Sequence, residues 1–269
     1  MQFLATSGLN TNNISWFWDL GNGNTSNIQN PTHQFMGAGS FLISLLVTNL
    51  DNTCETKIYQ NIDVYDNPVS DFLFDEVCFG EITSFSDIST SGSGNLMQWL
   101  WNFGDGSGIS PQKNPKYQYA NDGSFSVSLS VISDYGCENE TTKNVMVNEL
   151  PIAEFSITEA CLNDFNLFQS TSTIEVGNIT NWYWTFGDGV TFVGDREGDH
   201  TYLTYGSFDV HLIVTSDKGC EGEITHQAIV YPLPNPVFTA DNFCEGDITL
   251  FFENSNITSG NIIAWNWNF

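Results

Sequence analysis

The chain contains very few basic residues. Its 269 residues include 6 Lys and Arg against 32 Asp and Glu, which gives a formal net charge of −26 at pH 7. Nucleic acid and anionic membrane surfaces repel a chain of this charge, so neither is expected as a partner. The sequence also lacks an uninterrupted run of about 20 apolar residues, so it predicts no direct insertion into a membrane.

Signals for catalysis and for metal binding are also scarce. The four histidines lack the spacing of metal ligands; they are His33, His200, His211 and His226. No Ser-His-Asp order, His-Glu pair or phosphate-binding loop recurs along the chain. We therefore expect no enzyme activity and no cofactor, with calcium as the one alternative.

The main feature of the sequence is a tandem repeat. A Trp-x-Trp pair occurs four times, and each copy follows the last at a constant spacing of 83 (99 − 16, 182 − 99 and 265 − 182). The four copies are Trp16/Trp18, Trp99/Trp101, Trp182/Trp184 and Trp265/Trp267. Such a period indicates an array of one small domain, and it favours reach, display and attachment over chemistry.

Prolines mark the predicted boundaries between repeats. Pro68, Pro151 and Pro234 share the same period, and proline favours short, semi-rigid, extended joints. We expect a partial repeat, two whole repeats and a second partial repeat, over residues 1–66, 67–149, 150–232 and 233–269. The first residues show no signal-peptide pattern and the last repeat stops midway, so we expect a segment of a longer protein.

Alternating apolar residues predict β-strands. The runs Phe125–Val131, Phe208–Val214 and Phe41–Val47 place an apolar side chain at every second position, as in a strand with one buried face. No window shows the periodicity of an amphipathic helix. Short strands punctuated by Gly, Asn, Ser and Asp predict an all-β fold of antiparallel sandwiches.

A Gly-Asp-Gly turn follows the tryptophans, and with them it forms the repeated motif. The motif residues are Trp99, Trp101, Phe103, Gly104, Asp105 and Gly106 in one repeat, and Trp182, Trp184, Phe186, Gly187, Asp188 and Gly189 in the next. Glycine supplies the positive φ of such a turn, while Asp bonds the local backbone. The first repeat has Asn22 in place of Asp, so the turn matters more than the charge. Calcium bound through Asp105 and Asp188 is the alternative, although no complete calcium loop is present.

The aromatic side chains of the motif have two interpretations. Trp99, Trp101 and Phe103 fall on one strand face, where a sandwich needs its core. The alternative is an aromatic platform that stacks on polysaccharide. Residues on the opposite face are the better candidates for binding, namely Phe17, Leu100 and Tyr183.

Six cysteines that recur with the period of the repeat predict disulfides and an extracellular location. They are Cys54, Cys78, Cys137, Cys161, Cys220 and Cys244, and no pair has the CxxC spacing of a zinc site. Pairs at a spacing of 59 (137 − 78 and 220 − 161) would close each repeat on itself. Pairs at a spacing of 24 (78 − 54, 161 − 137 and 244 − 220) would clamp each joint. The loop entropies of the two patterns, about 4.3 and about 3.5 kcal/mol, are too similar to choose between them.

In combination, these motifs resemble the PKD (polycystic kidney disease) domain. Three sequence elements carry this resemblance: W-x-F-G-D-G at Trp101–Gly106, the H/Y-x-Y element at His200–Tyr202, and the alternating strand that follows. With Cys78-Phe79-Gly80 and Gly136-Cys137 added, the repeats are similar to those in large surface adhesins of gliding Bacteroidetes, including substrates of the type IX secretion system. This resemblance implies immunoglobulin-like β-sandwiches without enzymatic activity, and it places His33 and His200 at structural positions.

The function expected from the sequence is therefore structural. We expect a non-enzymatic, adhesive repeat segment of a long extracellular protein on a bacterial surface, an adhesin or a filament. Its expected partners are extracellular or cell-surface proteins or polysaccharides, with self-association into fibres as a further option. The alternative is an accessory carbohydrate-binding or spacer module of a secreted hydrolase.

Overall fold

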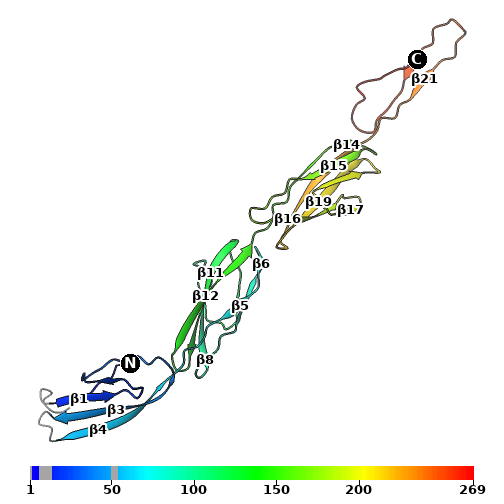
Figure 1. Ribbon diagram of the computed structural model, residues 1–269. Helices are drawn as coiled ribbons and strands as arrows, with labels where there is room; N and C mark the ends of the chain where they lie inside the picture. Colours follow the sequence, from blue (N-terminus) through cyan, green and yellow to red (C-terminus); the bar gives the residue numbers. More distant parts are fainter. Residues whose placement is uncertain (1, 6–13, 50–53) are drawn as a thin grey trace. The chain divides into compact units, whose positions relative to one another are not determined.

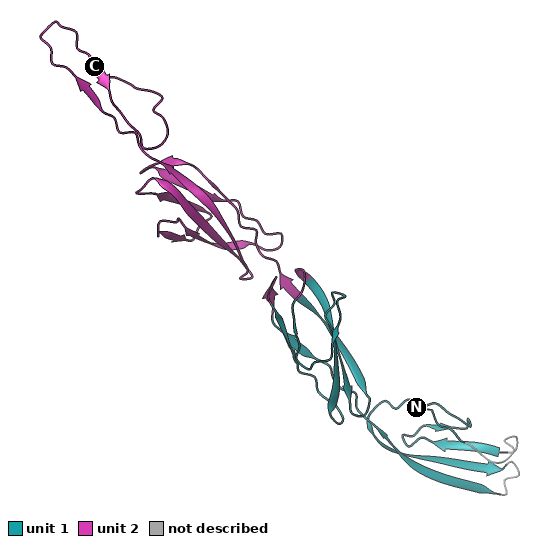
Figure 2. Cartoon of the chain, turned by 180° about the vertical axis from the view of Figure 1, so that it is seen from behind, with its two compact units in different colours: residues 1–75, 82–118, 124–145 teal, residues 76–81, 119–123, 146–269 magenta. Residues whose placement is uncertain are grey.

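The structure, a computed structural model, describes residues 2–5, 14–49 and 54–269, and all its regular elements are strands (Figure 1). Within these ranges there is no helix, and hence none long and apolar enough to cross a membrane. The prediction of an all-β fold is confirmed. The chain divides into two compact units (Figure 2), with residues 1–75, 82–118 and 124–145 in unit 1 and residues 76–81, 119–123 and 146–269 in unit 2.

The first repeat contributes one antiparallel sheet to unit 1, in the order β2-β1-β3-β4. Its strands are β1 (Ile14–Asp19), β2 (Thr25–Ser26), β3 (Gly39–Asn49) and β4 (Glu55–Val64). The predicted strand Phe41–Val47 lies within β3. Trp16 and Trp18 of β1 pack with Ile43 and Leu45 of β3 on one face of this sheet.

The second repeat folds into two sheets, in the orders β10-β7-β5 and β6-β12-β11-β8-β9. The strands are β5 (Phe72–Phe74), β6 (Val77–Cys78), β7 (Thr83–Asp87), β8 (Leu96–Asn102), β9 (Ile109–Ser110), β10 (Lys116–Tyr117), β11 (Gly123–Ser133) and β12 (Glu138–Asn148). The predicted alternation is confirmed in β11, where Val127, Leu129 and Val131 are buried and the residues between them are partly exposed. Aromatic side chains from the two sheets meet, because Trp101 of β8 lies 5.0 Å from Phe72 of β5 between ring centroids.

The third repeat has the same pair of sheets, in the orders β13-β15-β18 and β14-β20-β19-β16-β17. The strands are β13 (Phe155–Ile157), β14 (Ala160–Cys161), β15 (Phe165–Ser170), β16 (Ile179–Thr185), β17 (Thr191–Val193), β18 (Glu197–Thr201), β19 (Gly206–Ser216) and β20 (Glu221–Tyr231). Its core joins Phe155 and Phe168 from one sheet to Trp184 and Leu212 from the other. Further along, β21 (Phe238–Ala240) pairs with β22 (Phe251–Glu253).

Among the described strands, two ladders are parallel. Val77 of β6 pairs with Val147 of β12, and Ala160 of β14 pairs with Val230 of β20. In each case the chain leaves the small sheet after its first strand and joins the edge of the large sheet beside the last strand. This crossover fixes the positions of Cys78 and Cys161, which end β6 and β14.

Candidate functional site

The second tryptophan of each pair is a core residue with a fixed hydrogen bond. Trp101 and Trp184 are fully buried. In three repeats the indole Nε1 donates to a backbone carbonyl 11 residues further on: Trp18 to Gln29 at 3.3 Å, Trp101 to Gln112 at 2.8 Å and Trp184 to Asp195 at 3.4 Å. A buried indole that keeps a partner for its N–H is stable in a core. These rings are therefore closed to a ligand.

The first tryptophan of each pair lies at the edge of the core rather than within it. Trp99 is half-buried, and its Nε1 donates to Asp87 Oδ2 at 2.8 Å while Lys113 Nζ lies 5.3 Å from its ring centroid. In the third repeat, Trp182 is also half-buried and donates to Ser170 Oγ at 3.1 Å. The expectation that Trp99 shares the buried face of Trp101 is thus only partly met, because a polar partner at the rim holds its indole edge.

The glycines of the Gly-Asp-Gly turn have positive φ, as this turn requires. Gly104 and Gly106 have φ of 80° and 78°. A Cβ at Gly104 would lie 2.4 Å from the carbonyl oxygen of Ser126, and one at Gly187 would lie 2.6 Å from that of Asp209. The first glycine therefore permits both the turn and the close approach of the neighbouring strand.

The aspartate of the turn fastens it to a ring on the opposite sheet. Asp105 Oδ2 accepts a 2.6 Å hydrogen bond from the hydroxyl of Tyr117, and Oδ1 accepts from the backbone N–H of Ser107 at 3.0 Å. The Tyr117 ring stacks on Phe103 at 3.9 Å between centroids. Burial alone would raise the pKa of Asp105, but the hydrogen bonds from Tyr117 and Ser107 lower it on balance.

The third repeat makes the same contact with histidine. His200 Nε2 lies 2.7 Å from Asp188 Oδ2, and its ring stacks on Phe186 at 4.3 Å between centroids. Against the effect of burial, hydrogen bonds from Val190 and His200 lower the pKa of Asp188. In the first repeat, Asn22 Nδ2 and His33 Nε2 are 2.9 Å apart. We call this contact between the turn and the ring the turn clamp.

The turn clamp bears on the alternative of a calcium site. Both carboxylate oxygens of Asp105 and of Asp188 accept hydrogen bonds from protein groups. Across the described ranges, no cluster of three or more His, Cys, Asp or Glu side chains is arranged to hold a metal ion. The turn clamp therefore gives both aspartates a structural role, and calcium binding remains the alternative.

The predicted binding positions lie on the outer face of each large sheet. Phe17 and Leu100 are 43% and 46% exposed, whereas Tyr183 is half-buried. Beside Leu100 runs a groove lined by Met97, Trp99, Pro111, Ser130 and Ile132. Gln98 and Glu138 complete its lining, so the groove mixes aliphatic and polar side chains and offers Leu100 and one indole rather than a row of stacked aromatic rings.

Two other apolar hollows coincide with core positions of the repeat. One is lined by Trp16, Trp18 and Ile43 of the first repeat, and the other by Phe238, Phe251 and Trp267. One period earlier in the sequence, the second set corresponds to Phe155, Phe168 and Trp184, the buried core of the third repeat. Both hollows therefore belong to sandwich interiors and do not indicate a ligand.

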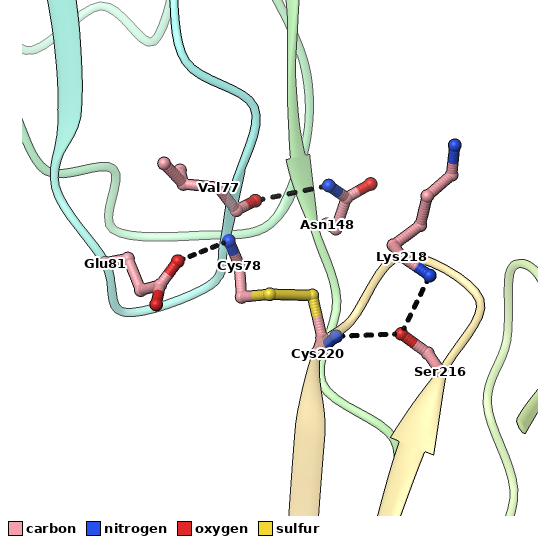
Figure 3. Close-up of a disulfide and its surroundings, with 7 residues drawn as sticks. All are labelled: Val77, Cys78, Glu81, Asn148, Ser216, Lys218 and Cys220. Carbon is pink, nitrogen blue, oxygen red and sulfur yellow. Dashed lines mark hydrogen bonds between the residues drawn. A yellow bond between two sulfur atoms is a disulfide. The ribbon is translucent and has the colours of Figure 1, made fainter. Parts of the chain in front are cut away.

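The disulfide pairing differs from both predicted patterns. Cys78 is bonded to Cys220, at a sequence separation of 142 and with 5.6 Å between their Cα atoms (Figure 3). Among the described residues the other four cysteines are thiols: Cys54, Cys137, Cys161 and Cys244. Neither predicted pattern forms, because the end of β6 faces the turn after β19, one repeat further along. Both residues belong to unit 2.

Hydrogen bonds hold both ends of this disulfide. Cys78 N donates to Glu81 Oε2 at 2.9 Å, and Asn148 Nδ2 donates to the carbonyl of Val77 at 3.3 Å. On the other side, Cys220 N donates to Ser216 Oγ at 3.1 Å (Figure 3). Cys220 is almost fully buried. The bond thus connects two ordered pieces of backbone, the end of a strand and a tight turn.

Within unit 1, a tyrosine pair occupies a comparable place. Tyr65 follows β4, and its ring stacks on that of Tyr135, in the turn after β11, at 3.7 Å between centroids and 8° between planes. The N–H of Asp66 donates to Ser93 Oγ at 3.0 Å. Sequence reasoning missed this pair, because the equivalent positions of the next repeat hold Asn148 and Lys218, so no repeat pattern marks it.

A sequence model of the PKD domain matches three consecutive stretches of the chain, residues 2–64, 65–147 and 148–231. A Vibrio cholerae protein named pre-pro-metalloprotease PrtV is 33% identical over 140 residues, which are 51% of this chain and 15% of that protein. The microbial collagenase of Vibrio alginolyticus is 42% identical over 69 residues, 26% of this chain and 8% of the collagenase. The chain thus spans only a small part of the length of these relatives.

Solved structures of single domains are similar as well. The PKD1 domain of the Vibrio cholerae metalloprotease PrtV is 29% identical, with a TM-score of 0.29, over 31% of this chain and 99% of the domain. The PKD1 domain of Vibrio anguillarum Epp is also 29% identical, with a TM-score of 0.30, over 32% of this chain and 99% of the domain.

Proposed function

The chain belongs to the PKD domain family, and on that premise we propose that it is a non-enzymatic, structural and adhesive repeat segment of a long extracellular protein on a bacterial cell surface. The predicted repeats 1–66, 67–149, 150–232 and 233–269 are its proposed domains. Its partners are extracellular or cell-surface proteins or polysaccharides. Gliding motility and export by the type IX secretion system are part of the same proposal.

One observation carries this proposal: the side chains that recur from repeat to repeat are used within the fold. Trp101 and Trp184 lie in cores, and Asp105 and Asp188 hold the turn clamp. A repeat maintained for a ligand would place recurring polar or aromatic groups on its surface. Here recurrence coincides with burial and turn geometry, which is what a load-bearing module requires.

The disulfide supports a mechanical role. It locks 142 residues of backbone against extension. At about 3.5 Å per residue of extended chain, these residues represent about 500 Å of length that tension cannot release while the bond is intact. A disulfide that persists also fits an oxidising, extracellular location.

Single-molecule force spectroscopy tests the proposal. The oxidised chain is expected to unfold in discrete force peaks and to release about 500 Å less than the same chain treated with dithiothreitol. The Cys78→Ser variant serves as the control, because its extension should not depend on the reductant. Extension without force peaks would contradict a load-bearing function.

The alternative is an accessory module of a secreted hydrolase, and the kinship with a metalloprotease and a collagenase favours it. In that case the groove beside Leu100 would contact a polymeric substrate. Sedimentation of the chain with collagen fibrils and with insoluble polysaccharides is the test. Binding that Leu100→Ser abolishes and that Phe17→Ser leaves intact would support this alternative over the structural function.

A further inference from the structure

The described chain contains two kinds of cysteine half-site. The bridge half-site is a cysteine that ends the short parallel strand, as Cys78 does in β6 and Cys161 in β14. The turn half-site is a cysteine in the turn after the long central strand, as Cys220 is after β19 and Cys137 after β11. Cys78 and Cys220 are bonded to each other, whereas Cys161 and Cys137 are thiols.

The two bridge half-sites are alike in backbone structure. Cys78 lies opposite Asn148 in its parallel ladder, and Cys161 lies opposite Tyr231. The residue after each cysteine donates to the carbonyl of that opposite residue, at 2.7 Å for Phe79 and 2.8 Å for Leu162. The backbone therefore holds Cys161 as it holds the bonded Cys78.

The two turn half-sites are alike in the same way. The carbonyl of Cys220 accepts from Ser216 N at 2.8 Å, and that of Cys137 accepts from Ser133 N at 2.9 Å. The serine hydroxyl in turn accepts from the cysteine N–H, at 3.1 Å for Cys220 and 3.3 Å for Cys137. Cys137 differs from Cys220 mainly in exposure. Cys220, which is bonded to Cys78, is 1% exposed, whereas Cys137 is half-exposed.

We propose that Cys161 is a covalent attachment site for the turn cysteine of another repeat of this kind, and that Cys137 is the matching site for a bridge cysteine. The evidence is the bond between their equivalents, Cys78 and Cys220. This bond connects the second repeat to the third and does not close a single repeat on itself. By this rule, each bridge cysteine pairs with the turn cysteine that lies 142 positions further along the same chain. Where that position is missing, the turn cysteine of a second copy of the chain takes its place. This proposal depends on the structural function proposed above and specifies how repeats are linked.

Bond formation requires an oxidant, and a low-molecular-weight disulfide such as oxidised glutathione supplies it. The Cys161 thiolate attacks one sulfur of that disulfide and releases one glutathione thiolate. The second cysteine, as thiolate, then attacks Sγ of Cys161 and releases the other glutathione. Two thiol protons leave the protein, and two electrons reduce the small disulfide to two thiols.

The test compares two proteins refolded in a glutathione redox buffer and mapped as non-reduced peptides. The first is the 269-residue chain at low and high concentration. The second is the same chain followed by a copy of residues 187–232, which carries a second copy of Cys220 at position 303 (220 + 83). A blue shift of the total tryptophan emission relative to the 269-residue chain, as Trp267 becomes buried, shows that the added repeat has folded.

We expect Cys161 to bond to the copied Cys220 in the extended chain at every concentration, and Cys78–Cys220 to remain. A covalent dimer of the original chain through Cys161 and Cys137, formed only at high concentration, would show that a second copy can supply the partner. If no such dimer forms while Cys161 of the extended chain bonds to the copied Cys220, the partner of Cys161 is assigned to the same chain. Serine in place of the copied Cys220 is the matched control and should return Cys161 to the thiol state.

The proposal is overturned if Cys161 stays a thiol in both proteins, or if it bonds to Cys137 or Cys220 within one copy of the original chain. Neither result depends on the force measurement, which concerns Cys78–Cys220 alone. Failure of the linking rule can therefore be told apart from failure of the structural function.

Discussion

The ammonium group of Lys143 lies 2.6 Å from the carboxylate of Asp71 and 5.1 Å from the centroid of the Phe72 ring. It also donates to the carbonyl of Phe72 at 2.6 Å. One basic side chain thereby ties the last long strand of the second repeat to the first strand of its opposite sheet. The equivalent positions of the third repeat hold Glu154, Phe155 and His226. There His226 lies 2.6 Å from Glu154 and stacks edge-on against Phe155.

The contact between Glu154 and His226 predicts acid sensitivity of the third repeat. The hydrogen bond from His226 lowers the pKa of Glu154 below its ordinary value of 4.5. A carboxyl group with a lowered folded pKa stabilises the fold above its unfolded pKa, and that contribution is lost as the pH falls through the folded value. We expect the thermal midpoint of the third repeat to fall between pH 5 and pH 3, and Glu154→Gln to reduce this dependence. An unchanged pH slope in the variant would show that the pair contributes nothing.

Trp101 should be worth more to stability than Trp99. Trp101→Ala empties a fully buried site in contact with Phe72 and Phe85, and a loss of about 3–5 kcal/mol is expected. Trp101→Phe keeps much of the ring but leaves the carbonyl of Gln112 without its donor, at a cost of about 1–3 kcal/mol. Trp99→Ala, at the edge of the core, is the matched comparison. Urea unfolding followed by circular dichroism measures all three, and equal losses at the two tryptophans would contradict this assignment.

The turn clamp should depend on hydrogen bonding rather than on charge. Asp105→Asn retains an acceptor for Ser107 and a partner for Tyr117, as Asn22 does with His33 in the first repeat, so a change within about 1 kcal/mol is expected. Asp105→Ala removes both bonds and should cost about 1–3 kcal/mol. Urea unfolding of the two variants measures the difference, and equal losses would show that the acceptor contributes nothing.

The same variants test calcium. If Asp105 were a calcium ligand, added calcium would raise the thermal midpoint of the native chain, and Asp105→Asn would abolish that rise. With the clamp as the only role of Asp105, calcium changes neither the midpoint of the native chain nor that of Asp105→Asn. Differential scanning calorimetry with calcium and with a chelator separates the two cases.

The sequence predicted what depends on local pattern. The period of two in Phe125–Val131 and Phe208–Val214 predicted β11 and β19, and the constant spacing of the tryptophan pairs predicted the tandem organisation. Turn chemistry predicted positive φ at Gly104 and Gly187. These signals are short-range, so they are complete within a few residues.

Contacts between distant residues could not be predicted in this way. Cys78–Cys220 was missed because loop entropy changes only slowly with loop length and says nothing about which chain ends face each other. The stack of Tyr65 on Tyr135 was missed because the pair does not recur: the positions one period further on hold Asn148 and Lys218. The edge position of Trp99 was missed because strand alternation cannot tell the centre of a sheet from its rim.

The last prediction concerns Gly222, at the second position of β20. A Cβ built on this residue would lie 1.9 Å from the carbonyl oxygen of Pro151, which is a backbone atom and cannot rotate away. Gly222→Ala should therefore displace β20 from the chain that enters the third repeat and cost about 1–3 kcal/mol, as overpacking does in well-packed cores. Gly37→Ala is the matched control, because nothing lies within 4 Å of its Cβ position, and its effect should stay within about 0.5 kcal/mol. Both are measured by urea unfolding, and equal stability of the two variants would show that this approach of β20 to Pro151 is not tight.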